Sequence, residues 1–316
     1  MKRVAFVFPG QGSQAVGMGQ EMYNEYQEVK SLFQTADELL PHPITPLMFE
    51  GPAEELTKTE NAQPALLLTS AAIFQVLQNE GVRPVVTAGH SLGEYSALVA
   101  AGVFSAEDAA VLVNKRGQLM EKAYPAGQGS MAAVLGLGVE EIQAVLQTVN
   151  DTHNEIVDAA NINCPGQVVI SGTKNGIELA EPLLKEAGAK RVLPLNVSGP
   201  FHSRLMKEAA EEFGSVLKEV EKTDASIPVY ANVTANKVQD HKDIEQLLIE
   251  QLYSPVRFEE TIVNMLQDDN LDAIVEVGNG KVLSGLVKKI NRRTTTFNVQ
   301  DSESLQAFLT WYKEEA

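Results

Sequence analysis

The sequence predicts an α/β fold in which a parallel β-sheet forms the main domain and a smaller subdomain is inserted into it. Three observations support this prediction. Short apolar, β-type runs alternate with helical patterns from the first residues onward, as expected where helices join parallel strands. The pattern changes between residues 127 and 199 and then returns to its earlier form. The chain has 316 residues, enough for two units or for one large unit with an insertion.

The main domain begins with a buried strand at Val4–Phe8, where every residue is apolar. Pro64–Asn79 is apolar almost all round, with a proline at its start and Gly81 just past its end, which predicts a buried helix. The other main-domain elements that we expect are strands at Val85–Ala88, Pro228–Asn232 and Ala273–Val277 and helices at Leu92–Ala101 and Ser105–Ala123.

The segment between residues 127 and 199 contains a β-α-β-β-α-β order, which is the ferredoxin-like arrangement. We expect strands at Met131–Leu135, Ile156–Ala160, Val168–Ser171 and Arg191–Leu195 and helices at Glu140–Val149 and Asn175–Ala187. Glycines at 127 and 129 mark the entry to this segment, and Gly199-Pro200 marks its exit. We therefore assign residues 1–126 and 200–316 to the main domain and residues 127–199 to the insert.

Composition and charge exclude several classes of protein. Hydrophobic residues make up 44% of the chain and charged residues 21%, which is ordinary for a globular protein. The 25 Lys and Arg against 42 Asp and Glu give a net charge of −17, which argues against a nucleic acid as partner. The single cysteine, Cys164, cannot form an internal disulfide and suits a reducing compartment. The sequence shows neither a signal-peptide pattern nor a membrane-span pattern, so we expect a cytoplasmic protein.

A serine lies in a motif that is typical of nucleophiles. Gly89-His90-Ser91-Leu92-Gly93 matches G-x-S-x-G and falls between a predicted strand and a predicted helix. Such a tight turn would expose the Ser91 hydroxyl, and the glycines would keep Cβ atoms out of the bend. The first free N–H groups of the helix, beginning with Leu92, would face an oxyanion formed on Ser91. A chance match is the alternative, and the flanking strand and helix favour a nucleophile.

A nucleophilic serine needs a base, and five histidines are available. His90 adjoins Ser91 in a tight turn, where neighbouring side chains point apart. Three others lie in a proline-flanked loop or in acid-rich stretches: His42, His153 and His241. His202 precedes an amphipathic helix, whose N-terminus would disfavour the imidazolium form. We predict that His202 is the base, and a buried histidine satisfied by backbone groups is the alternative.

Arg116 falls in the apolar stripe of the predicted helix from Ser105 to Ala123, which begins with the capping pattern Ser105-x-x-Asp108. A buried guanidinium is costly without an anion, so a negative group should meet Arg116. That group could be an internal acid. It could also be a substrate carboxylate, which a guanidinium binds through two parallel hydrogen bonds. Periodicity alone leaves both possibilities open.

Several motifs together resemble the malonyl-CoA:acyl carrier protein transacylases of bacterial fatty-acid synthesis. They are Phe8–Gln14, Gly89–Glu94, Arg116, Ala160–Gln167, Pro200–Ser203 and Gln251–Val256. The resemblance covers essentially the whole chain and implies an α/β-hydrolase-like core with a ferredoxin-like insert. It also implies transfer of a malonyl group from malonyl-CoA to the phosphopantetheine thiol of acyl carrier protein through a malonyl-serine intermediate. No metal and no organic cofactor are implied.

The resemblance implies roles for individual residues of this chain. Ser91 would be the nucleophile, His202 its general base, and Gln251 would orient the imidazole through its backbone carbonyl. The backbone amides of Gln11 and Leu92 would form the oxyanion hole. Arg116 would hold the malonyl carboxylate, which favours the second of the two possibilities above. The residues expected to line the cleft are Gln63, Asn161 and Asn163.

An acidic carrier protein and the phosphates of CoA require a local basic surface on a chain of this charge. The strongest candidate is a cluster of four cations, Lys288, Lys289, Arg292 and Arg293, after a helix that begins near Lys281. Further candidates are Lys190, Arg191, Arg204 and Lys207. We predict that the four-cation cluster docks the carrier. The alternative is that these cations only stabilise the end of a helix.

Two other functions remain open from the sequence. A serine esterase or thioesterase would place an Asp or Glu between its serine and its histidine in the chain. Asp158 lies in that interval, although within the insert. The second alternative is a carrier-binding protein that keeps the fold without the chemistry. Cys164 is expected to be a small buried residue without reactivity.

Overall fold

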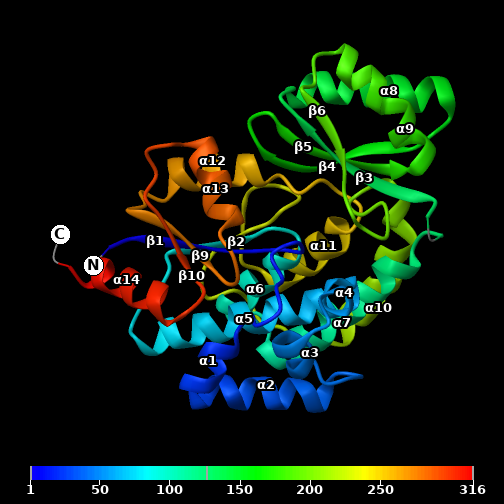
Figure 1. Ribbon diagram of the computed structural model, residues 1–316. Helices are drawn as coiled ribbons and strands as arrows, with labels where there is room; N and C mark the ends of the chain where they lie inside the picture. Colours follow the sequence, from blue (N-terminus) through cyan, green and yellow to red (C-terminus); the bar gives the residue numbers. More distant parts are fainter. Residues whose placement is uncertain (1, 126, 315–316) are drawn as a thin grey trace.

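The computed structural model describes residues 2–125 and 127–314 and contains two β-sheets with helices around them (Figure 1). Residues 1, 126, 315 and 316, which the predicted domain ranges include, lie outside the described residues. The larger sheet has the strand order β10-β9-β1-β2-β7-β8. Its strands are β1 (Val4–Phe8), β2 (Val86–Gly89), β7 (Val229–Tyr230), β8 (Lys237–Val238), β9 (Ala273–Val277) and β10 (Thr296–Val299). All pairs are parallel except β7 with β8, so the predicted α/β class is confirmed.

Helices cover both faces of this sheet, and β1 shows why its strands are apolar throughout. Val4, Phe6 and Phe8 face an apolar cluster with α5 and α6, whereas Ala5 and Val7 face a second cluster with α12 and α13. A strand buried on both faces has no polar alternation. The main-domain helices are α1 (Gln20–Glu25), α2 (Gln27–Leu39), α3 (Thr45–Glu50), α4 (Ala53–Thr57), α5 (Thr59–Asn79), α6 (Leu92–Ala100), α7 (Ala106–Lys122), α10 (Lys207–Glu219), α11 (His241–Gln251), α12 (Phe258–Asp268), α13 (Val282–Ile290) and α14 (Ser302–Lys313).

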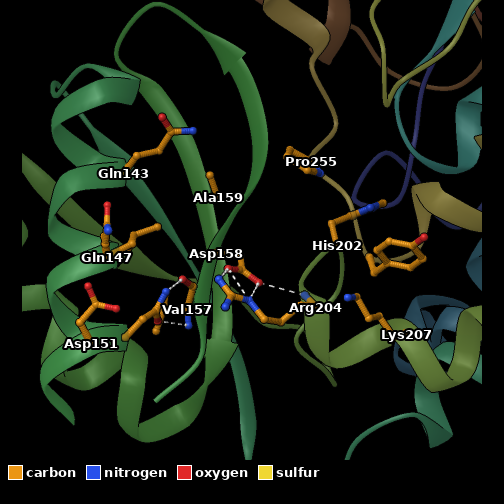
Figure 2. Close-up of a pocket in the computed structure, with 13 residues that line it drawn as sticks. Gln143, Gln147, Asp151, Val157, Asp158, Ala159, His202, Arg204, Lys207 and Pro255 are labelled. Atoms are coloured by element: carbon orange, nitrogen blue, oxygen red, sulfur yellow. Dashed lines mark hydrogen bonds and ion pairs between the residues drawn. The ribbon is translucent and has the colours of Figure 1, made fainter. Parts of the chain in front are cut away.

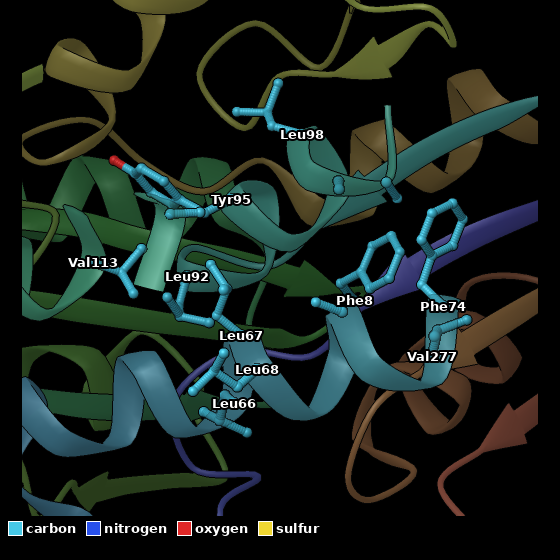
Figure 3. Packing of buried hydrophobic residues seen from close by; sticks show 14 of the residues in the cluster. Phe8, Leu66, Leu67, Leu68, Phe74, Leu92, Tyr95, Leu98, Val113 and Val277 are labelled. Atoms are coloured by element: carbon cyan, nitrogen blue, oxygen red, sulfur yellow. The ribbon is translucent and has the colours of Figure 1, made fainter. Parts of the chain in front are cut away.

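The central helix α5 begins at Thr59, five residues before the predicted start at Pro64. A proline inside a helix leaves the carbonyl four residues earlier without its usual N–H donor. In this chain the Glu60 carbonyl accepts a hydrogen bond of 2.8 Å from Asn114 Nδ2 of α7 instead. The helix therefore continues through the proline. Figure 3 shows its leucines in the same apolar cluster as Leu92 and Tyr95 of α6.

The smaller sheet is the predicted insert. Its strands are β3 (Gly129–Leu135), β4 (Val157–Cys164), β5 (Gln167–Thr173) and β6 (Arg191–Pro194), and its helices are α8 (Val139–His153) and α9 (Lys174–Glu186). The strand order β4-β5-β3-β6 is antiparallel throughout, which confirms the ferredoxin-like arrangement. We propose domain boundaries at residues 127 and 199, which enclose these elements and their separate apolar core.

Backbone hydrogen bonds join the insert to the main domain. The N–H of Ile162 donates to the Val256 carbonyl at 2.9 Å, and the N–H of Val256 donates to the Ala160 carbonyl at 2.8 Å. These bonds hold β4 beside the segment that follows α11. Within residues 2–125 and 127–314, no helix has both the length and the apolar character that crossing a bilayer requires.

Candidate active site

Ser91 lies in the sharp turn between β2 and α6, with φ 50° and ψ −106°. A positive φ is unusual for a residue with a side chain and requires support from its surroundings. Asn232 supplies it, because its Oδ1 accepts a hydrogen bond of 2.8 Å from the Ser91 N–H and its Nδ2 donates to the Gly89 carbonyl at 2.6 Å. The bend is also tightly packed. A Cβ atom on Gly89 would lie 1.9 Å from the Gly93 carbonyl carbon.

The predicted serine and histidine are in contact. Ser91 Oγ lies 2.8 Å from His202 Nε2, and His202 Nδ1 lies 2.8 Å from the Gln251 carbonyl oxygen. Because a carbonyl oxygen can only accept, Nδ1 must carry the proton, which leaves Nε2 free to accept from the Ser91 hydroxyl. The imidazole is therefore in the tautomer that a general base requires.

The neutral state of His202 has a different cause from the one that the sequence suggested. Burial and the nearby Arg116 guanidinium lower the pKa of His202 to about 3. The expected helix N-terminus does not lie directly beside it, because a 3₁₀ turn at Arg204–Met206 comes first and α10 begins only at Lys207. Removal from water and a neighbouring positive charge both disfavour imidazolium.

Arg116 lies on α7 with 1% of its surface exposed, and its guanidinium reaches the nucleophile. Nη1 donates to Gln63 Oε1 at 2.8 Å, and Nη2 donates to Gln251 Oε1 at 2.9 Å and to Ser91 Oγ at 3.2 Å. Among the described residues no carboxylate forms an ion pair with it. Neutral amide oxygens hold this buried cation, so the internal ion pair that periodicity left open does not occur in the described chain.

Ser91 and His202 line a cavity of about 300 Å³ between the main domain and the insert, whereas Arg116 does not line it and contacts it through Ser91 Oγ. The residues lining it include Gln11, His90, Ser91, Met120, Asn161 and His202. The backbone N–H groups of Gln11 and Leu92, the expected oxyanion hole, have no hydrogen-bond acceptor within the described part of the chain. Gln63 lies behind Arg116 and does not line the cavity, which corrects its expected place. Asn163 is also buried behind the wall, where its Oδ1 lies 2.8 Å from His90 Nε2.

Residues 5–307 match the family described as "Acyl transferase domain". The chain is 54% identical to the malonyl CoA-acyl carrier protein transacylase of Bacillus subtilis strain 168, over 100% of this chain and 99% of that protein. It belongs to the malonyl CoA-acyl carrier protein transacylase family. A crystal structure of an acyl carrier protein S-malonyltransferase from Vibrio cholerae is similar, with a TM-score of 0.94 and 47% identity over 97% of this chain and 99% of that one.

A second similar structure is a malonyl-transacylase solved in complex with a type II PKS acyl-carrier protein. Its TM-score is 0.94 and its identity 42%, over 98% of this chain and 99% of that one. Identity at this level over nearly the whole chain extends to the parallel core and the insert alike. The α/β-hydrolase-like core with a ferredoxin-like insert is therefore the fold of this transacylase family member.

A wider cleft adjoins His202 (Figure 2). Its volume is about 660 Å³. One wall consists of α8 side chains of the insert, including Gln143 and Gln147, and the opposite wall carries Arg204 and Lys207. Arg204 forms an ion pair of 2.5 Å with Asp158 across the cleft. Because Asp158 is bound there and the Gln251 carbonyl occupies His202 Nδ1, Asp158 does not serve as the third member of a hydrolase triad.

The four-cation cluster lies outside both cavities. Lys288, Lys289, Arg292 and Arg293 are all exposed, on the end of α13 and in the loop that follows. Lys288 Nζ donates to the Thr294 carbonyl, and Lys289 Nζ donates to Gln167 Oε1 of the insert at 3.1 Å. None of the four lines the cavity or the wider cleft. The cluster is therefore exposed at the surface and separate from the reacting groups, and its role in docking stays a prediction.

Two buried polar residues of the site were not predicted. Glu94, on α6, is 2% exposed, and its Oε2 accepts hydrogen bonds from Gln251 Nε2 at 2.7 Å and from the Asn232 N–H at 3.1 Å. Burial raises the pKa of Glu94 to about 7, against the opposing effect of these hydrogen bonds and of Arg116. An acid in the otherwise apolar run of α6 was a signal for Glu94, whereas nothing in the sequence distinguishes Asn232.

The single cysteine and the possible metal ligands do not contribute reacting groups to the cavity. Cys164 is buried, and burial raises the pKa of its thiol, which is the state of an unreactive cysteine. In the part of the chain that the structure describes, one group of three side chains could hold a metal ion, namely Asp224, Asp240 and His241. This group is at the surface and lines neither the cavity nor the wider cleft.

Proposed function

We propose that this chain transfers a malonyl group from malonyl-CoA to the phosphopantetheine thiol of acyl carrier protein, with a malonyl ester of Ser91 as intermediate. One observation carries the proposal. Ser91 Oγ lies 2.8 Å from a neutral imidazole nitrogen and 3.2 Å from a guanidinium nitrogen of Arg116. A nucleophile within hydrogen-bond distance of both its base and a buried cation is what an acyl group ending in a carboxylate requires.

In the first half of the reaction His202 Nε2 takes the proton of Ser91 while Oγ attacks the thioester carbonyl of malonyl-CoA. The backbone N–H groups of Gln11 and Leu92 stabilise the oxyanion that forms. The C–S bond then breaks, and the proton on His202 passes to the departing CoA thiolate. Throughout, the Gln251 carbonyl holds Nδ1–H and keeps the imidazole in position.

Arg116 selects the acyl group. Its present acceptors, Gln63 Oε1 and Gln251 Oε1, are neutral, so a substrate carboxylate meets no competing negative charge in direct contact. A carboxylate forms shorter and stronger hydrogen bonds with a guanidinium than a neutral amide does. An acetyl group has no carboxylate and gains nothing from Arg116. Malonyl is therefore the preferred acyl group.

In the second half the thiol of the carrier's phosphopantetheine enters the same cleft. His202 takes the thiol proton, sulfur attacks the malonyl ester, and the proton returns to Ser91 Oγ as the C–O bond breaks. Each half exchanges one acyl bond for another with no change of oxidation state, so no redox cofactor is required, and His202 with the backbone N–H groups of Gln11 and Leu92 supplies the base and the oxyanion donors without a metal or an organic cofactor. The reaction supplies malonyl carrier to fatty-acid biosynthesis, and we place it in the cytoplasm.

Two basic surfaces support binding of the acidic carrier and of CoA. Arg204 and Lys207 line the cleft that leads to His202, and we assign them to the phosphates of CoA. Lys288, Lys289, Arg292 and Arg293 are exposed beside the insert, and we assign them to the carrier protein. Local positive potential of this kind can attract an anionic partner even where the net charge is −17.

Intact-protein mass spectrometry after mixing with malonyl-CoA tests the proposal. We expect the native chain to gain the mass of one malonyl group and Ser91→Ala to gain none. Added carrier protein with its phosphopantetheine should then take the group from Ser91, and initial-velocity lines should be parallel, as in a ping-pong reaction. Free malonate formed faster than loaded carrier would indicate a hydrolase, and absence of any mass gain would indicate a protein without the chemistry.

A further inference from the structure

The side-chain amide of Gln251 has a defined direction in the site. Its Nε2 faces three oxygen acceptors: Glu94 Oε2 at 2.7 Å, the Ser91 carbonyl at 3.0 Å and Asn232 Oδ1 at 3.2 Å. Its Oε1 faces Arg116 Nη2 at 2.9 Å. A reversed amide would place oxygen against three oxygens and an N–H against a guanidinium, so it would lose every one of these hydrogen bonds.

Glu94 is the only ionisable acceptor among those three, and the hydrogen bonds from Asn232 and Gln251 favour its charged form against the effect of burial. Its Oε2 also accepts from the Asn232 N–H, so one buried carboxylate oxygen holds both Gln251 and the residue that supports the Ser91 turn. Hydrogen bonds to a charged group contribute more than those between neutral groups. Glu94 therefore has the largest part in fixing which end of the Gln251 amide faces Arg116.

The placement of Glu94 also solves an electrostatic problem. Buried Arg116 needs a negative charge nearby, yet a carboxylate in direct contact would compete with the substrate carboxylate for the guanidinium. The Arg116 charge lowers the pKa of Glu94, and the Glu94 charge raises the pKa of Arg116, so each favours the charged form of the other. Gln251 is hydrogen-bonded to both side chains. One intervening amide thus places an ionisable acid near Arg116 while the Nη1 and Nη2 groups donate only to neutral oxygens.

We propose that Glu94 is a positioning residue that determines acyl-group selectivity by fixing the Gln251 amide and, through it, the Arg116 guanidinium. This inference rests on the proposed function, because it assumes that Arg116 binds the carboxylate of the acyl group. Glu94 hydrogen-bonds to Gln251 and Asn232 and not to Ser91 Oγ, so it acts through Gln251 and not on the substrate. The test must therefore separate selectivity from general loss of structure.

The test measures the second-order rate constants for acylation of Ser91 by malonyl-CoA and by acetyl-CoA, followed by intact-protein mass spectrometry. We expect Glu94→Ala to reduce the malonyl rate roughly 10- to 100-fold more than the acetyl rate, as for loss of a hydrogen bond to a charged group. Glu94→Gln keeps an acceptor oxygen for both donors but removes the charge. Its malonyl-to-acetyl ratio should fall between those of the native chain and Glu94→Ala.

Glu276→Ala is the matched control. Glu276 is also a fully buried glutamate with a raised pKa, and it accepts the backbone N–H groups of Leu283 and Ser284 at the start of α13, away from Ser91. We expect this variant to lower the midpoint of thermal unfolding without changing the malonyl-to-acetyl ratio. A double-mutant cycle adds a second control. In an Arg116→Ala background, Glu94→Ala should leave the malonyl-to-acetyl ratio unchanged, because Glu94 affects selectivity only through Gln251 and Arg116.

Equal reduction of both acylation rates by Glu94→Ala and Glu94→Gln would overturn the inference and leave Glu94 with a structural role only. If circular dichroism shows that Glu94→Ala does not fold, the test rests on Glu94→Gln. A malonyl-to-acetyl ratio in Glu94→Gln equal to that of the native chain would then overturn the inference. Failure of the proposed function is distinguishable from either result, because the native chain itself would then show no malonyl ester on Ser91.

Discussion

Arg116 is a buried cation whose N–H groups meet amide and hydroxyl oxygens, and this arrangement predicts how its loss should act. Arg116→Ala removes two parallel hydrogen bonds to the acyl carboxylate, each worth about 1.5–3 kcal/mol. We expect the kcat/KM for malonyl-CoA to fall roughly 100-fold or more. The rate of acetyl transfer should change little or even rise, because the smaller acyl group never used the guanidinium.

Acetyl-CoA is the internal control for this variant, and steady-state kinetics with both thioesters make the measurement. A common fall in both rates would mean that Arg116 acts only as a structural residue. Arg116→Lys adds a second comparison, since it keeps the charge but loses the planar pair of donors. Its malonyl-to-acetyl ratio should therefore lie between those of the native chain and Arg116→Ala.

His202 predicts an unusual pH dependence. Burial and Arg116 lower its pKa to about 3, from an ordinary value of 6.5, so the imidazole stays neutral where an ordinary histidine takes up a proton. The rate of Ser91 acylation should not decline as the pH falls through about 6.5. Arg116→Ala removes one of the two causes, so the pKa of His202 should rise and the acidic limb should move to higher pH, measured with acetyl-CoA.

The same shift has a consequence for stability. The unfolded chain takes up a proton at His202 below about pH 6.5 while the folded chain does not, so this residue lowers stability progressively as the pH falls from about 6.5 toward 3.

Glu94 titrates in the same range, because burial raises its pKa to about 7. If the rate of Ser91 acylation changes near pH 7 in the native chain but not in Glu94→Gln, the change arises from the titration of Glu94. A change near pH 7 that remains in Glu94→Gln would contradict the lowered pKa of His202.

At the scale of single elements, the turn between β2 and α6 depends on the absence of two Cβ atoms. An alanine usually stabilises a helix by about 1 kcal/mol relative to glycine. At Gly93 the sign should reverse, because the new Cβ would lie 2.0 Å from the Phe8 carbonyl oxygen of β1. We expect Gly93→Ala to lower the free energy of unfolding by about 1–3 kcal/mol or more and to abolish acylation of Ser91.

Gly285→Ala is the control within another helix. Gly285 lies in α13, and a Cβ there would meet no atom within 4 Å. This variant should raise the free energy of unfolding by roughly 0.5–1 kcal/mol, the ordinary gain of alanine over glycine. Denaturant unfolding measures both variants. A stabilised Gly93→Ala chain that still forms the malonyl ester would show that the turn has more room than the structure indicates.

Elements and contacts differ in how far the sequence predicts them. The strand at Val4–Phe8 and the order of the insert follow from apolar runs and periodicity, which act locally and can be seen in one sequence. The start of α5 was predicted at Pro64 and lies at Thr59, because Asn114 of another helix satisfies the carbonyl that the proline leaves without a donor. A compensation of that kind comes from residues distant in the chain, which periodicity does not reveal.

The candidate site shows the same division. G-x-S-x-G predicts the Ser91 turn from five consecutive residues, and the resemblance to a family places His202, Gln251 and Arg116 around it. Gln63 was expected to line the cleft and instead supports Arg116 from behind, a distinction that depends on side-chain direction. Asn232 is held to Ser91 across 141 positions of sequence, so no local pattern could reveal it.

At the scale of the whole molecule, the reacting groups lie where the two sheets meet. Backbone bonds from β4 to Val256 and the ion pair between Asp158 and Arg204 both join the insert to the main domain. The wider cleft between them opens onto His202, so a long flexible thiol arm can reach the serine from outside. A protein partner therefore needs to contact only the outer surface, which makes surface charge the main determinant of docking.

The last prediction concerns that charge. Arg292 and Arg293 are the members of the four-cation cluster best suited to mutation, because Lys288 and Lys289 already bind Thr294 and Gln167. We expect Arg292→Glu with Arg293→Glu to raise the KM for carrier protein several-fold to roughly tenfold, and to leave the KM for malonyl-CoA nearly unchanged. The difference should shrink at high salt, since screening shortens the range of surface charges.

Reversal of two exposed lysines elsewhere, Lys218→Glu with Lys242→Glu, changes the net charge by the same amount and is the matched control. If net charge alone governs the encounter, both pairs should raise the carrier's KM equally. If the cluster docks the carrier, only the arginine pair should do so. An unchanged carrier KM in the arginine variant would remove the cluster from the docking surface and leave the further candidates, Lys190, Arg191, Arg204 and Lys207, to be tested in the same way.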